Sequence, residues 1–392
     1  MLKEFWVDNY KSLVNMTFCP SEQNLLLGAN NSGKTNLCQA MTLLSVTAQL
    51  PLDRCIQAVV GIPQVIGNHR LKKSTVEFRA VAEVPFESEG QREDLQFEYG
   101  LTLSLPNPSR STHAEVETEV LKVTGPGFSG TVLLENTRQG TRVLHEGGHL
   151  AGKPSYAESQ APRDATMLYR LYDLSANPRA NCFRRYLWSW RYYALSADAL
   201  RGMQYAMLPT LLPNGSNLAS VIYALKNSDE RSYRKLLGHL RTIDPQIDAI
   251  NFMPLVQDAV VMHFDDAHGN KVPAAYASPG TLKYLALLYI MLVQADAVPG
   301  RLLMIEEPEN GIYVGRLKSL LEVAQDSPAQ PQLIFTTHSP YFIDLFDTSL
   351  DGVFVVNRGE SHSTITQPGE ATVRKRLAEF PLGEQHFREM LG

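Results

Sequence analysis

The stretch with the clearest chemical meaning is Gly-Ala-Asn-Asn-Ser-Gly-Lys-Thr, residues 28–35. It has the spacing of a phosphate-binding loop, with an apolar run before it and a helix-like pattern after it. Gly28 and Gly33 permit backbone conformations that a Cβ atom would oppose, so the loop can direct N–H groups at phosphate oxygens. Lys34 would reach the β- and γ-phosphates, and the Thr35 hydroxyl would ligate Mg²⁺. We therefore predict a nucleoside triphosphate site formed by Gly28, Asn30, Asn31, Ser32, Gly33, Lys34, Thr35 and Asn36.

A second chemistry-bearing stretch is the apolar run 301–305, which ends in two neighbouring glutamates, Glu306 and Glu307. An apolar strand that ends in acidic residues is the Walker B arrangement. We assign Glu306 to Mg²⁺ through its water shell, and Glu307 to orienting or deprotonating the attacking water. The alternative is an exposed acidic turn after a buried strand, which the upstream phosphate-binding loop makes less favoured.

Two further stretches offer polar groups at the ends of predicted elements. Ser278-Pro279-Gly280-Thr281 begins an apolar helix over 282–293, and a helix start with small residues and a hydroxyl can bind an anion. The same residues also make a plain N-cap. His338 follows the apolar strand 332–337, at the carboxyl end where ligands gather in open α/β sheets, although a single histidine is usually structural.

Two other patterns lead to weaker hypotheses. His145-Glu146-Gly147-Gly148-His149 fits H-E-x-x-H, but the two glycines after a strand predict a turn, so we reject a zinc protease. Residues 183–193 combine arginines with aromatics. This composition suits an aromatic core, a partner interface or a grip on single-stranded nucleic acid, and we favour the core.

The elements that must position these residues alternate in type along the chain. Residues 1–27 predict short strands that lead into the loop, and residues 35–48 predict the helix after it. Between 74 and 145 the pattern predicts an antiparallel β-rich block, residues 147–165 a linker, and residues 166–245 mostly helices. Residues 248–264 again predict strand, and residues 265–270 predict a hairpin turn.

Composition excludes several classes of protein. The chain has 392 residues, of which 44% are hydrophobic and 20% charged, which is ordinary for a globular protein. A formal net charge of −5 gives no global signal for nucleic-acid binding. We expect no membrane span and no signal peptide, and the four scattered cysteines suggest reduced thiols in the cytoplasm.

The order of these motifs resembles the ABC-type ATPase heads of RecF, the SMC proteins and the OLD (overcoming lysogenization defect) family. The nearest resemblance is to RecF/OLD-like AAA-family ATPases without long arms, and it covers nearly the whole chain. Weaker matches lie at residues 9–12, 215–218 and 382–384. The resemblance implies an α/β P-loop NTPase fold (an ABC/RecF-like head) with an antiparallel β-rich lobe and an inserted helical subdomain. We expect an N-terminal ATPase lobe at 1–145, a linker and helical insert at 146–245, and a C-terminal ATPase lobe at 246–392.

The resemblance also implies ATP and Mg²⁺ as ligands and a head-to-tail homodimer. ATP on Lys34 and Thr35 of one copy would be capped by Ser278 and Gly280 of the other, and His338 would contact the γ-phosphate. Residues 310 and 311 would lie in a loop that crosses the interface.

Some positions depart from the family pattern. The metal-holding acid is usually Asp but is Glu306 here, Pro279 replaces an acid in the signature, and Tyr313-Val314 replaces a His-Pro pair. These changes put the rate of hydrolysis in doubt more than nucleotide binding. We expect no TOPRIM nuclease domain, since only about fifty residues follow residue 339.

Three functions fit these features. The first is an ATP-driven dimeric switch in phage or plasmid defence, acting with a separate nuclease or toxin. The second is a DNA-repair or DNA-structure ATPase that contacts nucleic acid directly. The third is an ATP-dependent scaffold with negligible turnover.

Overall fold

The computed structural model describes residues 1–68, 70–71, 73–88, 90–106, 113–146, 155–171, 175–202, 210–254, 260–294, 300–312, 314–325, 329–338, 342, 344–346 and 350–368. Its described residues form two compact units, one of residues 1–190 with 351–368, and one of residues 191–350. The weak family match at 382–384, together with Tyr313, Ser339 and His149, lies outside the described residues.

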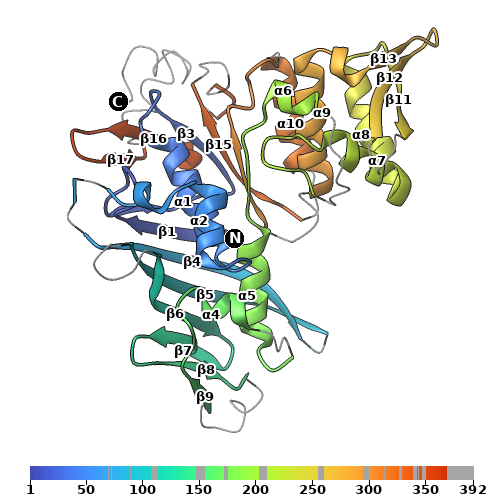
Figure 1. The fold of residues 1–392 in the computed structure, drawn as a ribbon. Helices are drawn as coiled ribbons and strands as arrows, with labels where there is room; N and C mark the ends of the chain where they lie inside the picture. The colour runs from blue at the N-terminus through green and yellow to red at the C-terminus, as the bar shows by residue number, and fades with distance from the viewer. Residues whose placement is uncertain are drawn as a thin grey trace. The chain divides into compact units, whose positions relative to one another are not determined.

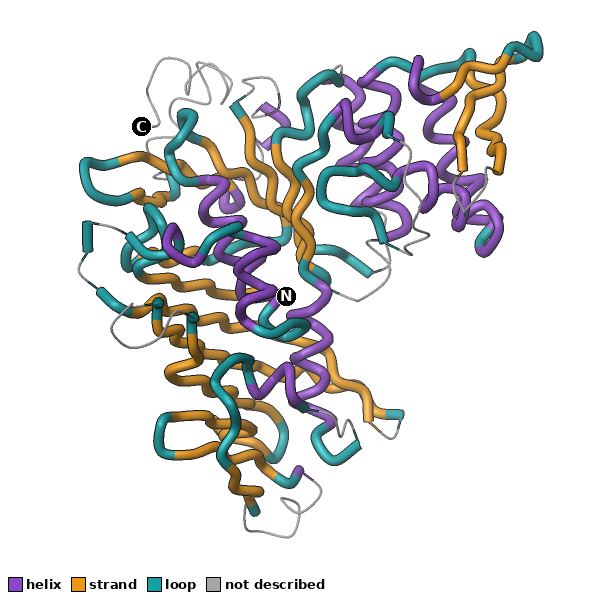
Figure 2. The backbone as a smooth tube through the Cα atoms, in the orientation of Figure 1, coloured by secondary structure: helices purple, strands orange, loops and turns teal. Residues whose placement is uncertain are grey.

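An antiparallel sheet of eight strands dominates the first unit, in the order β2-β1-β4-β5-β6-β7-β8-β9 (Figures 1 and 2). Along β4, Val76, Phe78 and Ala80 are buried between more exposed neighbours, because successive residues of a strand point to opposite faces. The strands are β1 (Leu2–Asp8), β2 (Met16–Phe18), β4 (Thr75–Ser88), β5 (Gln91–Ser104), β6 (Glu115–Gly125), β7 (Phe128–Thr137), β8 (Gly140–Leu144) and β9 (Tyr156–Ser159).

Two short helices cover part of this sheet, α4 (Met167–Arg170) and α5 (Pro178–Ser189). α5 packs on β4 and β7 (Figure 1). Its buried Phe183 ring lies 5.3 Å from the ring of Phe97 and 5.5 Å from that of Tyr99, both on β5. This aromatic cluster is the core between the helix and the sheet.

The phosphate-binding loop belongs to a second group of strands in the same unit. β3 (Gln23–Leu27) pairs in parallel with β16 (Val353–Arg358), which pairs antiparallel with β17 (Ser363–Thr366). The loop then leads into α1 (Lys34–Val46), followed by α2 (Leu52–Val59) and the 3₁₀ turn η1 (Pro63–Val65). The loop is therefore positioned by β16 and β17, which come from the far end of the described sequence.

The second unit contains three strands in parallel, β10 (Arg191–Tyr193), β14 (Leu302–Glu306) and β15 (Gln332–Thr337). β14 and β15 are buried almost throughout, as expected for parallel strands that are covered on both faces. Helix α9 (Pro279–Tyr289) continues into a π-helical turn over Ile290–Gln294, and it packs against α6 (Ala197–Leu200) and α10 (Val314–Gln325).

A small antiparallel sheet forms another part of the second unit. Its strands are β11 (Ile247–Pro254), β12 (Val260–Asp266) and β13 (Lys271–Pro273). Helices α7 (Leu218–Ser228) and α8 (Glu230–Ile243) pack on β12 and β11 respectively. The 3₁₀ turns η2 (Ala274–Tyr276), η5 (Asp344–Phe346) and η6 (Leu350–Gly352) complete the described elements.

Most predicted elements are confirmed. The strand before the loop, the helix after it, the antiparallel block, the hairpin before residue 271 and the strands before Glu307 and His338 all form. The cysteines are free. No helix among the described ranges is long and apolar enough to cross a membrane.

Three segments differ from the prediction. Residues 156–159, expected in a linker, form β9, and residues 191–193, expected in a helical region, form β10. Residues 9–13, expected as strand, form a turn in which Asn9 and Lys11 have positive φ angles of 60° and 50°. β9 and β10 are short strands that form through pairing with β8 and β14, whereas the turn is closed by hydrogen bonds between Tyr10 and Leu13.

Candidate functional site

The phosphate-binding loop is shaped by two glycines that lie against neighbouring strands. Gly28 has a φ of 153°, and a Cβ atom there would lie 2.1 Å from the carbonyl oxygen of Val356 in β16. Gly33 has a φ of 118°, and its Cβ atom would lie 2.4 Å from the Oγ atom of Ser363 in β17. Asn31 also has a positive φ of 66°, a conformation that asparagine adopts more easily than most residues. The loop therefore tolerates side chains poorly at both glycines.

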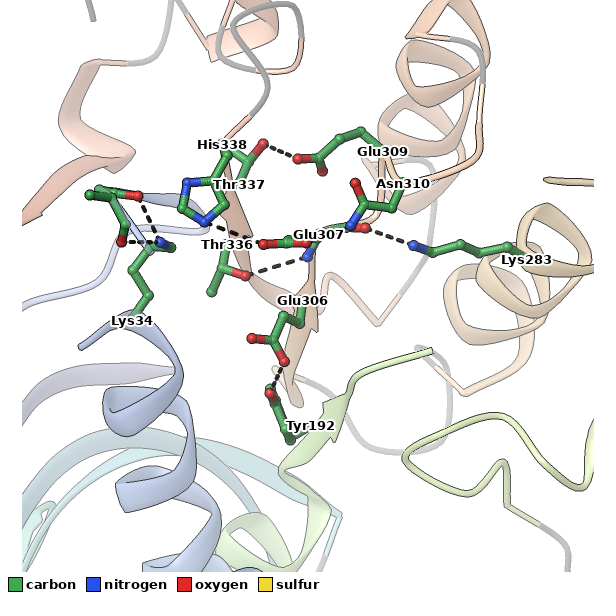
Figure 3. Close-up of polar contacts among 12 residues, drawn as sticks. Lys34, Tyr192, Lys283, Glu306, Glu307, Glu309, Asn310, Thr336, Thr337 and His338 are labelled. Carbon is green, nitrogen blue, oxygen red and sulfur yellow. Dashed lines mark hydrogen bonds and ion pairs between the residues drawn. The ribbon is translucent and has the colours of Figure 1, made fainter. Parts of the chain in front are cut away.

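The start of α1 has no side-chain cap. Its N-cap is Gly33, which has no side chain to satisfy the first helical N–H groups. The Ser32 hydroxyl is buried and has no hydrogen-bond partner among the described residues. Lys34 is 6% exposed, and its ammonium donates to the carbonyl oxygens of Gly28 at 2.7 Å and Ala29 at 3.1 Å (Figure 3). Lys34 thus bonds to the loop's own carbonyl oxygens, and a bound phosphate would compete with them for the same ammonium.

In the second unit, Glu306 ends β14 and points toward Tyr192 of β10 (Figure 3). The Tyr192 hydroxyl donates to the Glu306 carboxylate. This contact follows from the parallel pairing of the two strands, which places Tyr192 opposite Met304. The predicted metal-holding acid therefore already has a hydrogen-bond donor that fixes its direction.

Glu307 is held at every polar group. It has a left-handed φ of 42°, which is uncommon for a residue with a side chain. Its N–H group donates to the carbonyl oxygen of Thr336 at 3.0 Å, and its own carbonyl oxygen accepts from Lys283 Nζ at 2.7 Å. Its carboxylate lies 3.3 Å from His338 Nε2 and accepts from the Asn310 side-chain amide (Figure 3). The predicted water-orienting residue and the predicted switch histidine are in contact.

The Ser278 hydroxyl acts as the N-cap of α9, accepting from the Thr281 N–H group at 3.0 Å, with Pro279 at the first helical position. The N-cap alternative therefore describes what this hydroxyl does in the structure. Gly280 approaches the loop after β14 closely, since a Cβ atom there would lie 2.3 Å from the carbonyl oxygen of Gly311. This packing leaves no room for a side chain at Gly280.

Comparison with known proteins agrees with the motifs. Residues 176–344 match a family model described as "AAA domain, putative AbiEii toxin, Type IV TA system". A crystal structure of an SMC head bound to the C-winged helix domain of ScpA aligns with a TM-score of 0.54 at 13% identity, over 95% of this chain and 99% of that chain. The chain has the fold of an ABC-type P-loop ATPase head.

Two other SMC heads align with this chain at lower TM-scores. The SMC head domain from Thermotoga maritima gives a TM-score of 0.40 at 14% identity, over 93% of this chain and 98% of that one. The Smc head with an extended coiled coil, bound to the C-terminal domain of ScpA derived from Pyrococcus furiosus, gives 0.45 at 15% identity, over 96% and 98%. Comparison with curated protein sequences gives no match.

Next to the loop lies a hydrogen-bonded cluster that the sequence pattern did not reveal. The Ser363 hydroxyl donates to the Ser32 carbonyl oxygen at 2.5 Å and lies 2.8 Å from the Ser12 hydroxyl. Asn36, which we predicted to bind nucleotide, donates its side-chain amide to Ser12 at 2.8 Å. Ser12 and Ser363 are buried. The cluster joins β17 to the loop, and no motif spacing connects residues this far apart in sequence.

A cavity of about 430 Å³ lies beside the acidic strand end of the second unit. It is lined by the segment around residues 194–197 and by Pro279, Lys283, Glu306, Glu307, Asn310 and Gly311. Burial lowers the pKa of Lys283, although the carboxylates of Glu309 and Glu307 act to raise it. Burial likewise raises the pKa of Glu309, which accepts from the Thr337 hydroxyl. The buried Lys283 and two carboxylates, those of Glu306 and Glu307, therefore line the same cavity.

The rejected zinc-protease pattern has a structural role in the head. Glu146 is buried, and its carboxylate oxygens accept from the backbone N–H groups of Arg179 at 2.9 Å and Ala180 at 3.1 Å. These are the first turn of α5, so Glu146 caps that helix from a distance. Among the described residues no cluster of His, Cys, Asp or Glu is arranged to hold a metal ion.

The aromatic stretch 183–193 is mostly core. Phe183, Tyr186, Trp190 and Tyr193 are at most 2% exposed, while Trp188 is 44% exposed. The Arg184 guanidinium donates to the Leu171 carbonyl oxygen at 2.7 Å. The favoured interpretation as an aromatic core is confirmed, because buried rings cannot stack on nucleobases.

The predicted site residues divide between the two units. Gly28 to Asn36 belong to the first, whereas Ser278, Gly280, Glu306, Glu307 and His338 belong to the second. Within the second unit, Glu307 and His338 are in contact. Sequence reasoning missed Lys283 and Tyr192. The signal for Lys283 was available, because it is a charged residue inside an otherwise apolar helix.

Proposed function

We propose that the chain is a switch ATPase that binds ATP and Mg²⁺, hydrolyses ATP to ADP and phosphate, and pairs head-to-tail with a second copy. The observation that carries this proposal is the hold on Glu307, whose carboxylate contacts His338 and Asn310 at the end of β14. A carboxylate fixed in direction can orient a water molecule and accept its proton. A protein that only bound nucleotide would not need this arrangement.

The residues of the loop fit a polyphosphate. The uncapped start of α1 and the unpartnered Ser32 hydroxyl supply donors, and Lys34 supplies a positive charge. We propose that these groups bind the phosphates, and that Thr35 and Glu306 hold Mg²⁺, Glu306 through water. Bound ATP·Mg²⁺ supplies an activated phosphoryl group with its charge partly neutralised.

In this proposal each chain residue has a separate task. Glu307 orients water and takes up its proton, and His338 fixes the direction of that carboxylate. Tyr192 fixes Glu306. Ser278 and Gly280 lie at the start of α9, where they would meet the nucleotide of a second copy. Glu306 is one methylene longer than the usual aspartate, so we expect slow turnover, which suits a switch.

ATP turnover by the purified full chain tests the activity. Glu307→Gln should retain ATP binding and lose turnover by about 100-fold or more, because the amide cannot accept the proton of water. Asp351→Asn, at an exposed acid of the first unit, is the matched control and should turn over ATP normally. Turnover by Glu307→Gln equal to that of the parent would remove Glu307 from its role. Absence of turnover in the parent would leave the scaffold function.

For the biological setting, we propose phage or plasmid defence with a separate effector protein. Support comes from the matched family description, which names a toxin of a toxin–antitoxin system, and from the aligned SMC head, which is bound to a domain of another protein. Phage plating on cells that produce the chain in its native host tests this. Protection should disappear with Glu307→Gln. If phage plating is the same with the parent chain and with Glu307→Gln, but cells that produce Glu307→Gln become sensitive to DNA damage, the repair function is favoured instead.

A further inference from the structure

Helix α9 touches the loop after β14 at two points on one helical face. Gly280 packs on Gly311 so closely that a Cβ atom would lie 2.3 Å from the Gly311 carbonyl oxygen. One turn later, Lys283 Nζ donates to the Glu307 carbonyl oxygen at 2.7 Å. Residues three apart lie on the same side of a helix, so both contacts face the loop together. A shift of α9 must therefore move the loop or break these contacts.

The loop between these contacts is a turn that begins at Glu307. The Glu307 carbonyl oxygen accepts from Lys283 and also from the Asn310 N–H group at 3.2 Å. The Asn310 side chain in turn donates to the Glu307 carboxylate. Glu307 itself has a left-handed backbone, which is costly for a residue with a Cβ atom and is kept only when its surroundings hold it. The hydrogen bond from Lys283 is the contact through which α9 helps to hold the Glu307 backbone in this conformation.

Lys283 is an unusual residue for a purely structural contact. It is 7% exposed, in a helix whose buried residues are otherwise mostly apolar. Burying an ammonium group is unfavourable unless it is paired, and an apolar side chain of similar volume would often be as stable there. Here the Glu307 carbonyl oxygen accepts from the ammonium, and the negative charges of Glu307 and Glu309 act to keep its pKa up. The electrostatic energy of the Lys283 ammonium therefore depends on the position of the loop that carries Glu307 and Glu309.

We propose that Lys283 is a positioning residue that couples the start of α9 to Glu307, so that engagement of Ser278 and Gly280 by the nucleotide of a second copy sets the backbone that carries the water-orienting carboxylate. This inference rests on the proposed function, because it needs α9 to meet that nucleotide. It gives the switch a physical link between the partner's bound ATP and hydrolysis in the same chain.

Lys283→Met tests the link, because methionine fills similar space without the ammonium. Lys318→Met, at an exposed position of α10, is the matched control for loss of a lysine charge. In Lys283→Met we expect kcat to fall about tenfold, with ATP affinity and the unfolding midpoint close to the parent values. In a Glu307→Gln background Lys283→Met should cause no further loss, since residues that act as a unit are not additive. A kcat equal to the parent value, or an additive loss in that background, would overturn the proposal.

Hydrogen exchange supplies a second readout that does not depend on turnover. The Asn310 N–H group is bonded to the same carbonyl oxygen as Lys283, so Lys283→Met should speed exchange in residues 307–312 while Lys318→Met leaves it unchanged. Unchanged exchange in Lys283→Met would show that Lys283 does not hold the turn. If the parent chain hydrolyses no ATP, the proposed function fails, and the exchange result alone decides whether the α9 contact positions Glu307.

Discussion

At the scale of single residues, the Lys34 ammonium can bond either to carbonyl oxygens of its own loop or to a phosphate group. Its ammonium donates to the carbonyl oxygens of Gly28 and Ala29, and a phosphate group would compete with these neutral acceptors. The bonds from the ammonium to carbonyl oxygens are already charge-assisted, but a phosphate group adds the attraction of an opposite charge. Binding would therefore draw Lys34 off the loop carbonyls, which frees the loop to rearrange around the phosphates.

Lys34→Met removes the ammonium and keeps most of the stem. We expect ATP affinity to fall by about 100-fold, since a charged hydrogen bond contributes roughly 1.5–3 kcal/mol and the attraction to phosphate is lost with it. Lys3→Met, at an exposed lysine of β1, should bind ATP like the parent. Isothermal titration calorimetry measures both affinities. Parent-like affinity in Lys34→Met would mean that the loop does not bind phosphate.

A comparison of Gly28 with Gly127 separates two costs of replacing a glycine, the strain of a positive φ angle and a steric clash of the added Cβ atom. Both have positive φ, but a Cβ atom on Gly28 meets the Val356 carbonyl oxygen at 2.1 Å, whereas one on Gly127 meets nothing within 4 Å. Gly127→Ala should lose about 1 kcal/mol of unfolding free energy from backbone strain alone. Gly28→Ala should lose about 3 kcal/mol or more, because β16 must also move. Denaturant unfolding measures both, and equal losses would contradict the close approach.

At the scale of elements, α4 shows how a buried carboxylate can complete a helix cap, because the Thr166 hydroxyl accepts only from the Tyr169 N–H group at 3.1 Å. Glu119 of β6 is fully buried and accepts from the N–H groups of Met167 at 2.6 Å and Leu168 at 3.0 Å, and from the Tyr99 hydroxyl at 3.0 Å. Burial raises the pKa of Glu119 from 4.5 to about 6, since the N–H and hydroxyl donors offset only part of the desolvation. The helix and the sheet are thus joined through one titrating group.

Glu119 gives this unit a pH dependence with a definite sign. A carboxyl group whose pKa is raised by folding adds stability that is complete below pH 4.5 and lost as the pH rises through 6. Glu119→Gln cannot ionise, so the unfolding free energy of the parent minus that of this variant should fall by about 2 kcal/mol between pH 4 and pH 7. Glu158→Gln, at an exposed position of β9, is the control. A difference that does not change with pH would contradict the raised pKa.

Local patterns predicted the elements that carry their own signals. The loop at 28–35 lies between a strand and a helix because its glycines, apolar run and periodic helix are all local. The same holds for the strand that ends at Glu306 and for Ser278 at the start of α9. β10 was missed because its three residues form a strand only through pairing with β14. Element type is therefore predictable where periodicity is long, and not where a distant partner decides it.

At the scale of the whole molecule, the parts that sequence could not supply are the long-range ones. β3 pairs with β16 and the loop rests on Ser363, although these segments lie at opposite ends of the described chain. The contact of Lys283 with Glu307 also joins separate elements. Motif spacing named Glu307 and His338, but only the folded chain brings them to 3.3 Å. The residues that position the site are therefore harder to predict than the residues in it.

At the scale of the assembled molecule, Ser278 gives the most direct test of the proposed head-to-tail pairing. Its hydroxyl caps α9, and aspartate and asparagine cap helices about as well as serine does. Ser278→Asp should therefore keep the stability of α9 but repel the phosphates of a second copy, whereas Ser278→Asn keeps the cap without the charge. Both variants are built on Glu307→Gln, so that ATP persists.

We expect ATP to double the mass of the Glu307→Gln chain and of its Ser278→Asn derivative in sedimentation velocity. The Ser278→Asp derivative should remain at the mass of one chain, with ATP affinity unchanged, because its own loop is intact. Addition of salt should weaken the effect of Ser278→Asp, since repulsion between partly exposed charges is screened within about 10 Å at 0.1 M ionic strength. An ATP-dependent dimer formed equally by Ser278→Asp and Ser278→Asn would place the start of α9 away from the second copy's nucleotide.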